Sequence, residues 1–263
     1  MVISYSYYPL FGDFMTLVAF LEKVIQARST DTVWKTTSEA LETHGFDRVI
    51  YGFTHFRTGD FVGDSDDLMV LSTYPKAYLR KLLQAARFYR YPPFAWALNN
   101  VGAKSWCCVQ DRKRKGRLTD AEKDMLKLNQ EHGIHAGYTI SFMDISARAK
   151  GAMALAARSE MSQDDADRIW QVHGKTIEII CNIAHLKLIS LPHAPNGRGL
   201  TPRQKEVLEW VAQGKTTQDI ATILNVTVAT VEKHLRLARL VLKVDTTAQA
   251  VSKAILRNQL FTS

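Results

Sequence analysis

Residues 200–243 read LTPRQKEVLEWVAQGKTTQDIATILNVTVATVEKHLRLARLVLK, and this stretch decides the fold of the C-terminal quarter of the chain. Gln204 follows the first threonine by three residues with a proline between them, which predicts a capping box with proline at the first helical position. Gly214 marks the end of that helix. A threonine able to cap a helix precedes each of three short apolar-periodic segments: Thr201, Thr216 and Thr227. A fourth helix is predicted over about 247–259.

The third of these segments carries one apolar stripe and a basic outer face. The spacing i, i+4, i+7 and i+11 predicts that one face of the helix is buried, through Val231, Leu235, Ala238 and Leu242. The remaining faces display Thr230, Lys233, His234, Arg236 and Arg239. Two helices joined by a tight turn, the second basic outside, are typical of a helix-turn-helix that enters the DNA major groove. The alternative is a small helical bundle with an ordinary solvated basic face.

The strings LTPR, VLEWVAQGKT, DIA and TVEKH occur here at the spacing found in one family of DNA-binding domains. The segment closely resembles the domain of LuxR (NarL-type) bacterial transcription factors, over about 60 residues. The resemblance implies an all-α four-helix domain whose partner is double-stranded DNA. It assigns DNA contact to seven residues: Lys215, Thr216, Thr227, Ala229, Thr230, Lys233 and Arg236. It assigns dimerisation to the last helix, through Val251, Ala254 and Ile255.

Two positions depart from the family pattern of this domain. Gln204 stands where the family normally has glutamate, and glutamine can still complete a capping box. Glu232 stands where some members carry a base-reading arginine. A carboxylate there repels phosphate and accepts only from donors such as a cytosine amino group, so we expect an unusual operator.

A positive charge excess and a preceding stretch rich in proline and glycine separate this quarter from the rest of the chain. Residues 200–263 hold nine Lys/Arg against five Asp/Glu, which is half of the net charge of +8 in a quarter of the length. This excess points to a nucleic-acid partner. The stretch LPHAPNGRGL contains two prolines, two glycines and an asparagine. We expect a first domain over 1–190, a linker over 191–199 and a second domain over 200–263.

The first domain alternates helical and strand-like patterns, which predicts an α/β fold with a sheet between two helix layers, an α-β-α sandwich. Strands are expected in four segments: VIYGFTHF, LMVLSTY, GYTISFMD and GAMALAARSE. Helices are expected near 15–27, 31–43, 76–87 and 119–132. A long final helix begins after Ser162, which can cap it, with Asp164 and Asp165 in its first turn.

The spacing of Tyr74, Tyr78, Tyr91-Pro92 and Trp106 marks a second resemblance, weaker and spread over about residues 15–190. It is to the autoinducer-binding domain of quorum-sensing LuxR proteins. The family pattern is Y-x-x-x-W-x-x-x-Y, then Asp-Pro, then a tryptophan fifteen residues after the aspartate. Here the corresponding residues are Tyr74, Tyr78, Leu82, Tyr91-Pro92 and Trp106, and HGIHAGYTI supplies the glycines of a later family segment. The resemblance implies a ligand pocket lined by Tyr74, Tyr78, Leu82, Phe88, Tyr91 and Trp106.

The departures at these positions bear on the ligand. In the family the aspartate accepts a hydrogen bond from the amide N–H of an acyl-homoserine lactone. Tyr91 cannot act as a charged acceptor, because a phenol is neutral at cytoplasmic pH. We therefore expect a standard acyl-homoserine lactone to bind poorly, and an orphan receptor for another small apolar molecule. Two alternatives stay open: a ligand-independent regulator with a self-filled pocket, and an antagonist that heterodimerises with a true receptor. In the first two cases a homodimer is expected.

The remaining features exclude other classes of protein. The chain has no G-x-S-x-G, H-E-x-x-H or phosphate-loop motif, so we expect no enzyme, metal or cofactor. Its three cysteines form neither a disulfide framework nor a metal-ligand pattern, and no signal peptide or membrane span is expected, so a cytoplasmic location is predicted. The run RKRKGR (112–117) is expected in a loop, as a solvated face or a contact with an anionic partner.

Overall fold

A computed structural model describes residues 8–58, 63, 67–84, 91–143, 146, 148–193 and 199–262 of the chain. The chain divides into two compact units, Met1–Leu188 and Ile189–Ser263, and each is described by itself. Among the described residues no helix is long and apolar enough to cross a membrane.

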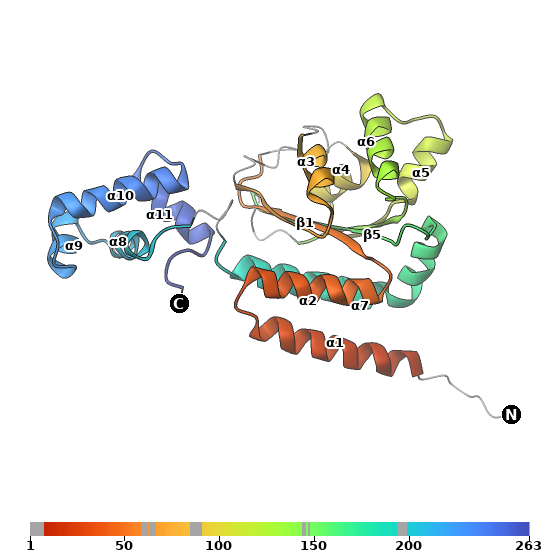
Figure 1. The fold of residues 1–263 in the computed structure, drawn as a ribbon, viewed down its shortest axis with the longest axis horizontal. Coiled ribbons are helices and arrows are strands. Elements are labelled where there is room, and N and C mark those ends of the chain that lie inside the picture. Colours follow the sequence, from red (N-terminus) through yellow and green to blue (C-terminus); the bar gives the residue numbers. More distant parts are fainter. Residues whose placement is uncertain are drawn as a thin grey trace. The chain divides into compact units, whose positions relative to one another are not determined.

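The first unit is built on one antiparallel sheet of five strands in the order β2-β1-β5-β4-β3 (Figure 1). The strands are β1 (Arg48–Thr54), β2 (Met69–Ser72), β3 (Gly102–Ser105), β4 (Gly137–Ser141) and β5 (Lys150–Ala156). The central pair β1 and β5 is in register along its length, with Tyr51 opposite Met153. All five residues of β4 are buried, because helices cover both faces of the sheet.

Helices form a layer on each side of this sheet (Figure 1). One layer consists of α2 (Thr30–Thr43) and α7 (Gln163–Ser190), with α1 (Tyr8–Gln26) packed on α2. The other consists of α3 (Lys76–Gln84), α4 (Pro92–Asn99), α5 (Cys107–Arg114) and α6 (Asp120–Glu131). The predicted α-β-α sandwich is confirmed.

Local capping explains where helices α7 and α6 begin. Ser162 accepts a hydrogen bond from the Asp165 amide at 3.2 Å, and its own amide donates to the Asp165 carboxylate at 2.9 Å. The predicted cap of α7 is thus present as a reciprocal pair. A second capping box joins Thr119 and Glu122 at the start of α6.

The sequence patterns missed three short elements, β3, α4 and α5. Strand β3 consists of GAKS and α5 of CCVQDRKR, neither of which has a clear apolar period. The prediction that RKRKGR lies in a loop was wrong for its first half, because Arg112–Arg114 form the last turn of α5. The sequence favoured a loop because the segment shows no apolar face.

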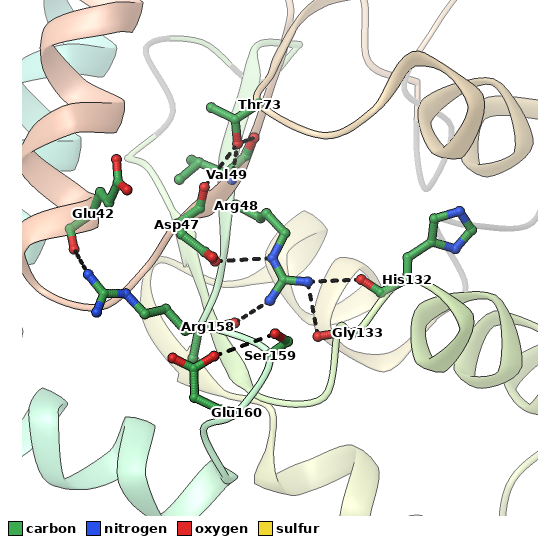
Figure 2. Close-up of polar contacts among 11 residues, drawn as sticks. Glu42, Asp47, Arg48, Val49, Thr73, His132, Gly133, Arg158, Ser159 and Glu160 are labelled. Carbon is green, nitrogen blue, oxygen red and sulfur yellow. Dashed lines mark hydrogen bonds and ion pairs between the residues drawn. The ribbon is translucent and has the colours of Figure 1, made fainter.

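Arg48 on β1 clamps the end of α6 onto the sheet (Figure 2). Its guanidinium donates to the carbonyls of His132 at 2.9 Å, Gly133 at 3.0 Å and Ala157 at 2.6 Å, and its Nε pairs with Asp47 at 3.0 Å. Gly133 adopts φ +67°, a left-handed turn that turns its carbonyl toward Arg48. This clamp fixes the position of α6, which forms one wall of the site described below.

Gly137 allows the Trp106 ring to approach the backbone at the start of β4 closely. A Cβ atom at Gly137 would stand 2.1 Å from the Leu155 carbonyl oxygen and 2.9 Å from the Trp106 ring. No side chain fits there, so the glycine at the start of β4 is a packing requirement.

The second unit contains α8 (Pro202–Ala212), α9 (Thr217–Ile223), α10 (Val228–Leu242) and α11 (Thr247–Leu256) around one core. Capping boxes start α8, α9 and α11, and the Thr227 hydroxyl accepts from the Thr230 amide at the start of α10. The first residues of the expected linker belong to this unit, since the His193 amide donates to the Arg257 carbonyl at 2.9 Å. Residues 194–198 lie outside the described residues.

Candidate functional site

A cavity of about 80 Å³, here named the sheet cavity, lies between the sheet and helices α3 and α4. Its lining is almost wholly apolar and includes Ile50, Gly52, Leu82, Phe94, Leu98 and Ala154. Of the described residues predicted to line a ligand pocket, Leu82 is the one found here. The cavity suits an aliphatic group, since little in its wall can form hydrogen bonds.

Among the described residues that line the sheet cavity, Lys150 is the one that carries a charge. It is 5% exposed, and its Nζ donates to the carbonyls of Asn100 at 3.2 Å and Phe142 at 3.4 Å. Burial, together with the charge of Lys150, lowers the pKa of His185 to about 4. His185 Nδ1 shares a hydrogen bond of 2.9 Å with the Tyr51 hydroxyl. The sequence offered one signal for Lys150, a lysine directly before the apolar strand segment GAMALA.

Three tyrosines expected in the pocket instead form a buried aromatic wall. The rings of Tyr74 and Tyr78 stack with centroids 4.8 Å apart, and the Tyr78 hydroxyl donates to Asn129 Oδ1 at 2.8 Å. Tyr91 is 7% exposed, and burial raises its pKa above the usual phenol range, an effect that a hydrogen bond with Asn129 partly offsets. All three phenols are therefore neutral, and two of them are associated with one amide of α6.

Trp106 completes the wall on the side of β4. Its Nε1 donates to Thr139 Oγ1 at 2.8 Å, and Thr139 lines the sheet cavity. Trp106 and Tyr91 themselves face a second, larger hollow between α5 and α6. Tyr74 and Tyr78, the other tyrosines of the wall, belong to the buried core and are in the lining of neither hollow. Phe88 lies outside the described residues.

Asn129 is the polar residue of this region that the sequence patterns missed. It is 7% exposed and belongs to α6, where its neighbours suggested only a helix face. The sequence itself shows only an asparagine within a helical pattern there, which carries no signal for this role. Its contacts with Tyr78 and Tyr91 could only be seen once α6 was placed against the sheet.

The second unit presents a basic face that begins at α9 and follows α10. Exposed residues there include Lys215, Thr216, Thr227, Ala229, Lys233 and Arg236, while Thr230 is half-buried. The buried side of α10 carries Val231, Leu235, Ala238 and Leu242, as its periodicity predicted. Lys215, Lys233 and Arg236 form no ion pair with any described residue. Such unpaired cations at the start of a helix suit contact with phosphates and base edges.

Two predicted roles in this unit change with the structure. Arg239, expected on the outer basic face, is half-buried, and its guanidinium donates to Thr247 Oγ1 at 2.9 Å, which joins α10 to α11. Ala254 is fully buried in the core of its own unit and so is not available to a dimer surface. Val251 is half-buried against that core, and Ile255 is 48% exposed.

The fold and the two sites together define a class of protein, a ligand-sensing unit joined to a helix-turn-helix DNA-binding unit. Residues 29–188 match the autoinducer binding domain family, and residues 198–254 match the luxR family of bacterial regulatory proteins. The chain belongs to the LuxR family of transcriptional regulators. This family consists of regulators, not enzymes.

Relatives of this chain bear names of the same kind. The transcriptional activator protein AnoR of Acinetobacter nosocomialis is 22% identical over 237 residues, which cover 90% of this chain and 95% of AnoR. Crystalline Escherichia coli SdiA has the same fold, with a TM-score of 0.50, 17% identity and coverage of 95% of this chain and 99% of SdiA. The lactone-dependent factor CepR2 of Burkholderia cenocepacia gives a TM-score of 0.52 at 15% identity, over 68% of this chain and 96% of CepR2.

Proposed function

We propose that this LuxR-type regulator binds operator DNA in the cytoplasm as a homodimer and responds to a small apolar molecule other than a standard acyl-homoserine lactone. The observation that carries the proposal is Tyr91. It stands where the family resemblance places an aspartate, it is buried, and its phenol is neutral. DNA contact is assigned to the exposed residues of α9 and α10 named above.

The missing acid weakens recognition of a lactone by a calculable amount. A charge-assisted hydrogen bond contributes about 1.5–3 kcal/mol, and an unpaired buried amide N–H costs a similar amount. Losing about 1.5–3 kcal/mol corresponds to roughly a 10- to 150-fold lower affinity. A ligand without an amide N–H avoids this cost.

A neutral acyl ester with hydroxyl groups is the ligand chemistry that these residues favour. SdiA has been solved in complex with octanoyl-rac-glycerol, in a structure with a TM-score of 0.51 and 15% identity to this chain, covering 98% of this chain and 100% of SdiA. An aliphatic chain suits the sheet cavity, and the hydroxyls of a glycerol ester can exchange hydrogen bonds with Tyr78, Tyr91 and Asn129.

Thermal melting of the purified protein tests this proposal, because a ligand that binds the native state must stabilise it. We expect octanoyl-rac-glycerol to raise the melting temperature and octanoyl-homoserine lactone to leave it unchanged. In Tyr91→Asp the lactone response should appear, and in the control Tyr91→Phe it should stay absent. A wild-type protein that the lactone stabilises as strongly as the ester does would overturn the proposal.

A second candidate, a ligand-independent regulator, is favoured by the size of the sheet cavity. Its volume of about 80 Å³ is smaller than the roughly 150 Å³ of an engineered cavity that holds benzene, and the Tyr78–Asn129 bond satisfies two polar groups internally. Gly52→Val separates the two candidates, because a Cβ at Gly52 meets nothing within 4 Å and the side chain enters the cavity. If Gly52→Val binds DNA as the wild type does, and no ligand stabilises the wild type, the second candidate is favoured.

A further inference from the structure

A hollow of about 530 Å³, here named the α5–α6 groove, lies on the other side of the aromatic wall from the sheet cavity. Its volume is within the range of about 300–1000 Å³ typical of small-molecule sites, whereas the sheet cavity is several times smaller. Among the described residues, the two hollows have no lining residue in common. The groove is therefore a separate place for a ligand.

The floor of the groove is apolar and ends in two polar groups. Trp106, Val109 and Leu126 supply apolar surface, and Ile134 lies with them. Asn129 and the phenol of Tyr91 lie at the buried end, each with 7% of its surface exposed. Partly exposed aromatic and aliphatic surface of this kind favours the hydrophobic part of a ligand.

The rim of the groove is cationic. Lys113 and Arg114 line it, and no described lining residue carries a carboxylate. Three acids of α5 and α6 are paired: Asp111 with Arg114, Glu122 with Arg112 at 3.0 Å, and Asp120 with Lys123 at 2.9 Å.

Lys113 is exposed and forms no ion pair with any residue that the structure describes. Lys113 and Lys127 also line an adjoining hollow of about 250 Å³, which continues the cationic surface. An anionic group at this rim therefore meets a positive charge that the protein itself leaves unneutralised.

We propose that the α5–α6 groove binds a small amphiphilic carboxylate, with its apolar part on Trp106 and Leu126 and its carboxylate at Lys113. The apolar floor distinguishes this ligand from DNA, whose phosphates present no apolar body. This ligand shares Tyr91 and Asn129 with the ester of the proposed function, whereas its contacts with Trp106, Leu126 and Lys113 are its own. Within the basic run 112–117, Lys113 thereby has a ligand-binding role.

Octanoate is a suitable probe, because octanoyl-rac-glycerol carries the same acyl chain without a charge. We expect titration calorimetry to detect octanoate binding that weakens as salt rises, since the contact with Lys113 is exposed. Lys113→Gln should lower the affinity for octanoate by about 3- to 10-fold. Lys115→Gln is the matched control: it removes the same charge two residues away, but Lys115 lines neither hollow.

Two further variants distinguish the groove from the other surfaces of the protein. Gln130→Trp, at an exposed position on the groove wall, should abolish octanoate binding without unfolding the protein. Gly52→Val, which fills the sheet cavity, should leave octanoate binding intact.

The opposite pattern, loss in Gly52→Val with normal binding in Lys113→Gln and Gln130→Trp, would place octanoate in the sheet cavity and overturn the proposal. Equal affinity in Lys113→Gln and Lys115→Gln would also overturn it. So would a reduced salt dependence of DNA binding in Lys113→Gln with no octanoate effect, because Lys113 would then be a phosphate contact.

Discussion

Polar groups on the outer face of α10 are exposed, whereas polar groups inside the sensing unit are hydrogen-bonded to other groups of the same unit. On α10, Lys233 and Arg236 are exposed and form no ion pair with the described residues. In the sensing unit, Tyr78 donates to Asn129, Trp106 donates to Thr139, and Arg48 donates to three carbonyls of its own chain. The exposed cations of α10 can therefore bind an external partner without breaking a bond within the protein. In the sensing unit, a polar group of a ligand must compete with the internal hydrogen bonds.

The largest effect is expected where the sensing unit is most tightly closed. In Gly137→Ala the new methyl group would stand 2.1 Å from the Leu155 carbonyl oxygen, so β4 or Trp106 must move. We expect a loss of about 3 kcal/mol or more in the stability of this unit, measured by denaturant unfolding followed by tryptophan fluorescence. Gly52→Ala is the control and should be neutral or stabilising, because its Cβ enters open space. Equal stability of the two variants would contradict the close packing described.

The second-largest effect is expected in the pH dependence of the stability of the sensing unit. Burial and the charge of Lys150 lower the pKa of His185 to about 4, against about 6.5 in the unfolded chain. Between these values the unfolded state binds a proton that the native state does not, so stability should fall as pH drops from about 6.5 to 4. The slope attributable to His185 is at most about 1.4 kcal/mol per pH unit.

Stability curves at several pH values for the wild type and His185→Gln measure this contribution. The variant should show a shallower loss over the same interval, because the remaining glutamine cannot take up a proton. Identical slopes in both proteins would rule out His185 as the source.

On the DNA-binding side, Arg236→Ala should weaken binding to a selected duplex about 10-fold, because an exposed cation at the groove is lost. If Arg236 contacts a phosphate, the slope of log affinity against log salt should fall by about 0.9. Lys175→Ala removes an equal charge from an exposed position on α7 and should change neither value. A wild-type slope in Arg236→Ala would indicate that this residue does not neutralise a phosphate.

The smallest effect is expected from the bond that joins the aromatic wall to α6. Tyr78→Phe leaves Asn129 Oδ1 without its hydroxyl donor, which should cost about 1 kcal/mol of stability. Combining it with Asn129→Leu in a double-mutant cycle measures the coupling. Additive losses would mean that the wall is held by packing alone.

Most of the second unit could be predicted from the sequence, because its signals are local. Thr201, Thr216 and Thr227 cap helices as expected, and Val231, Leu235, Ala238 and Leu242 form the buried stripe of α10. Ala254 was misplaced because a small apolar residue on a terminal helix suits a dimer surface and a core equally well. Only the packing of α11 on the rest of its unit distinguished them.

Less of the sensing site could be predicted, because it depends on residues far apart in the chain. The resemblance identified Tyr74, Tyr78, Leu82, Tyr91 and Trp106 as neighbours in a pocket. The structure places the four aromatic residues on the wall and Leu82 in the lining of the sheet cavity. Asn129 and Lys150 were missed, since each acquires its role from partners about 50 residues away.

The sequence by itself determined the helix boundaries of the DNA-binding unit and the excess positive charge there. It also determined that position 91 carries a tyrosine and not a carboxylic acid. These properties follow from short-range capping, periodicity and composition. Only the tertiary structure decided that Tyr78 is bonded to Asn129, that Lys150 lies in the sheet cavity, and that Lys113 faces a groove beside Trp106. The physical reason is that antiparallel pairing of β1, β4 and β5 brings distant segments together, and local patterns carry no information about such pairing.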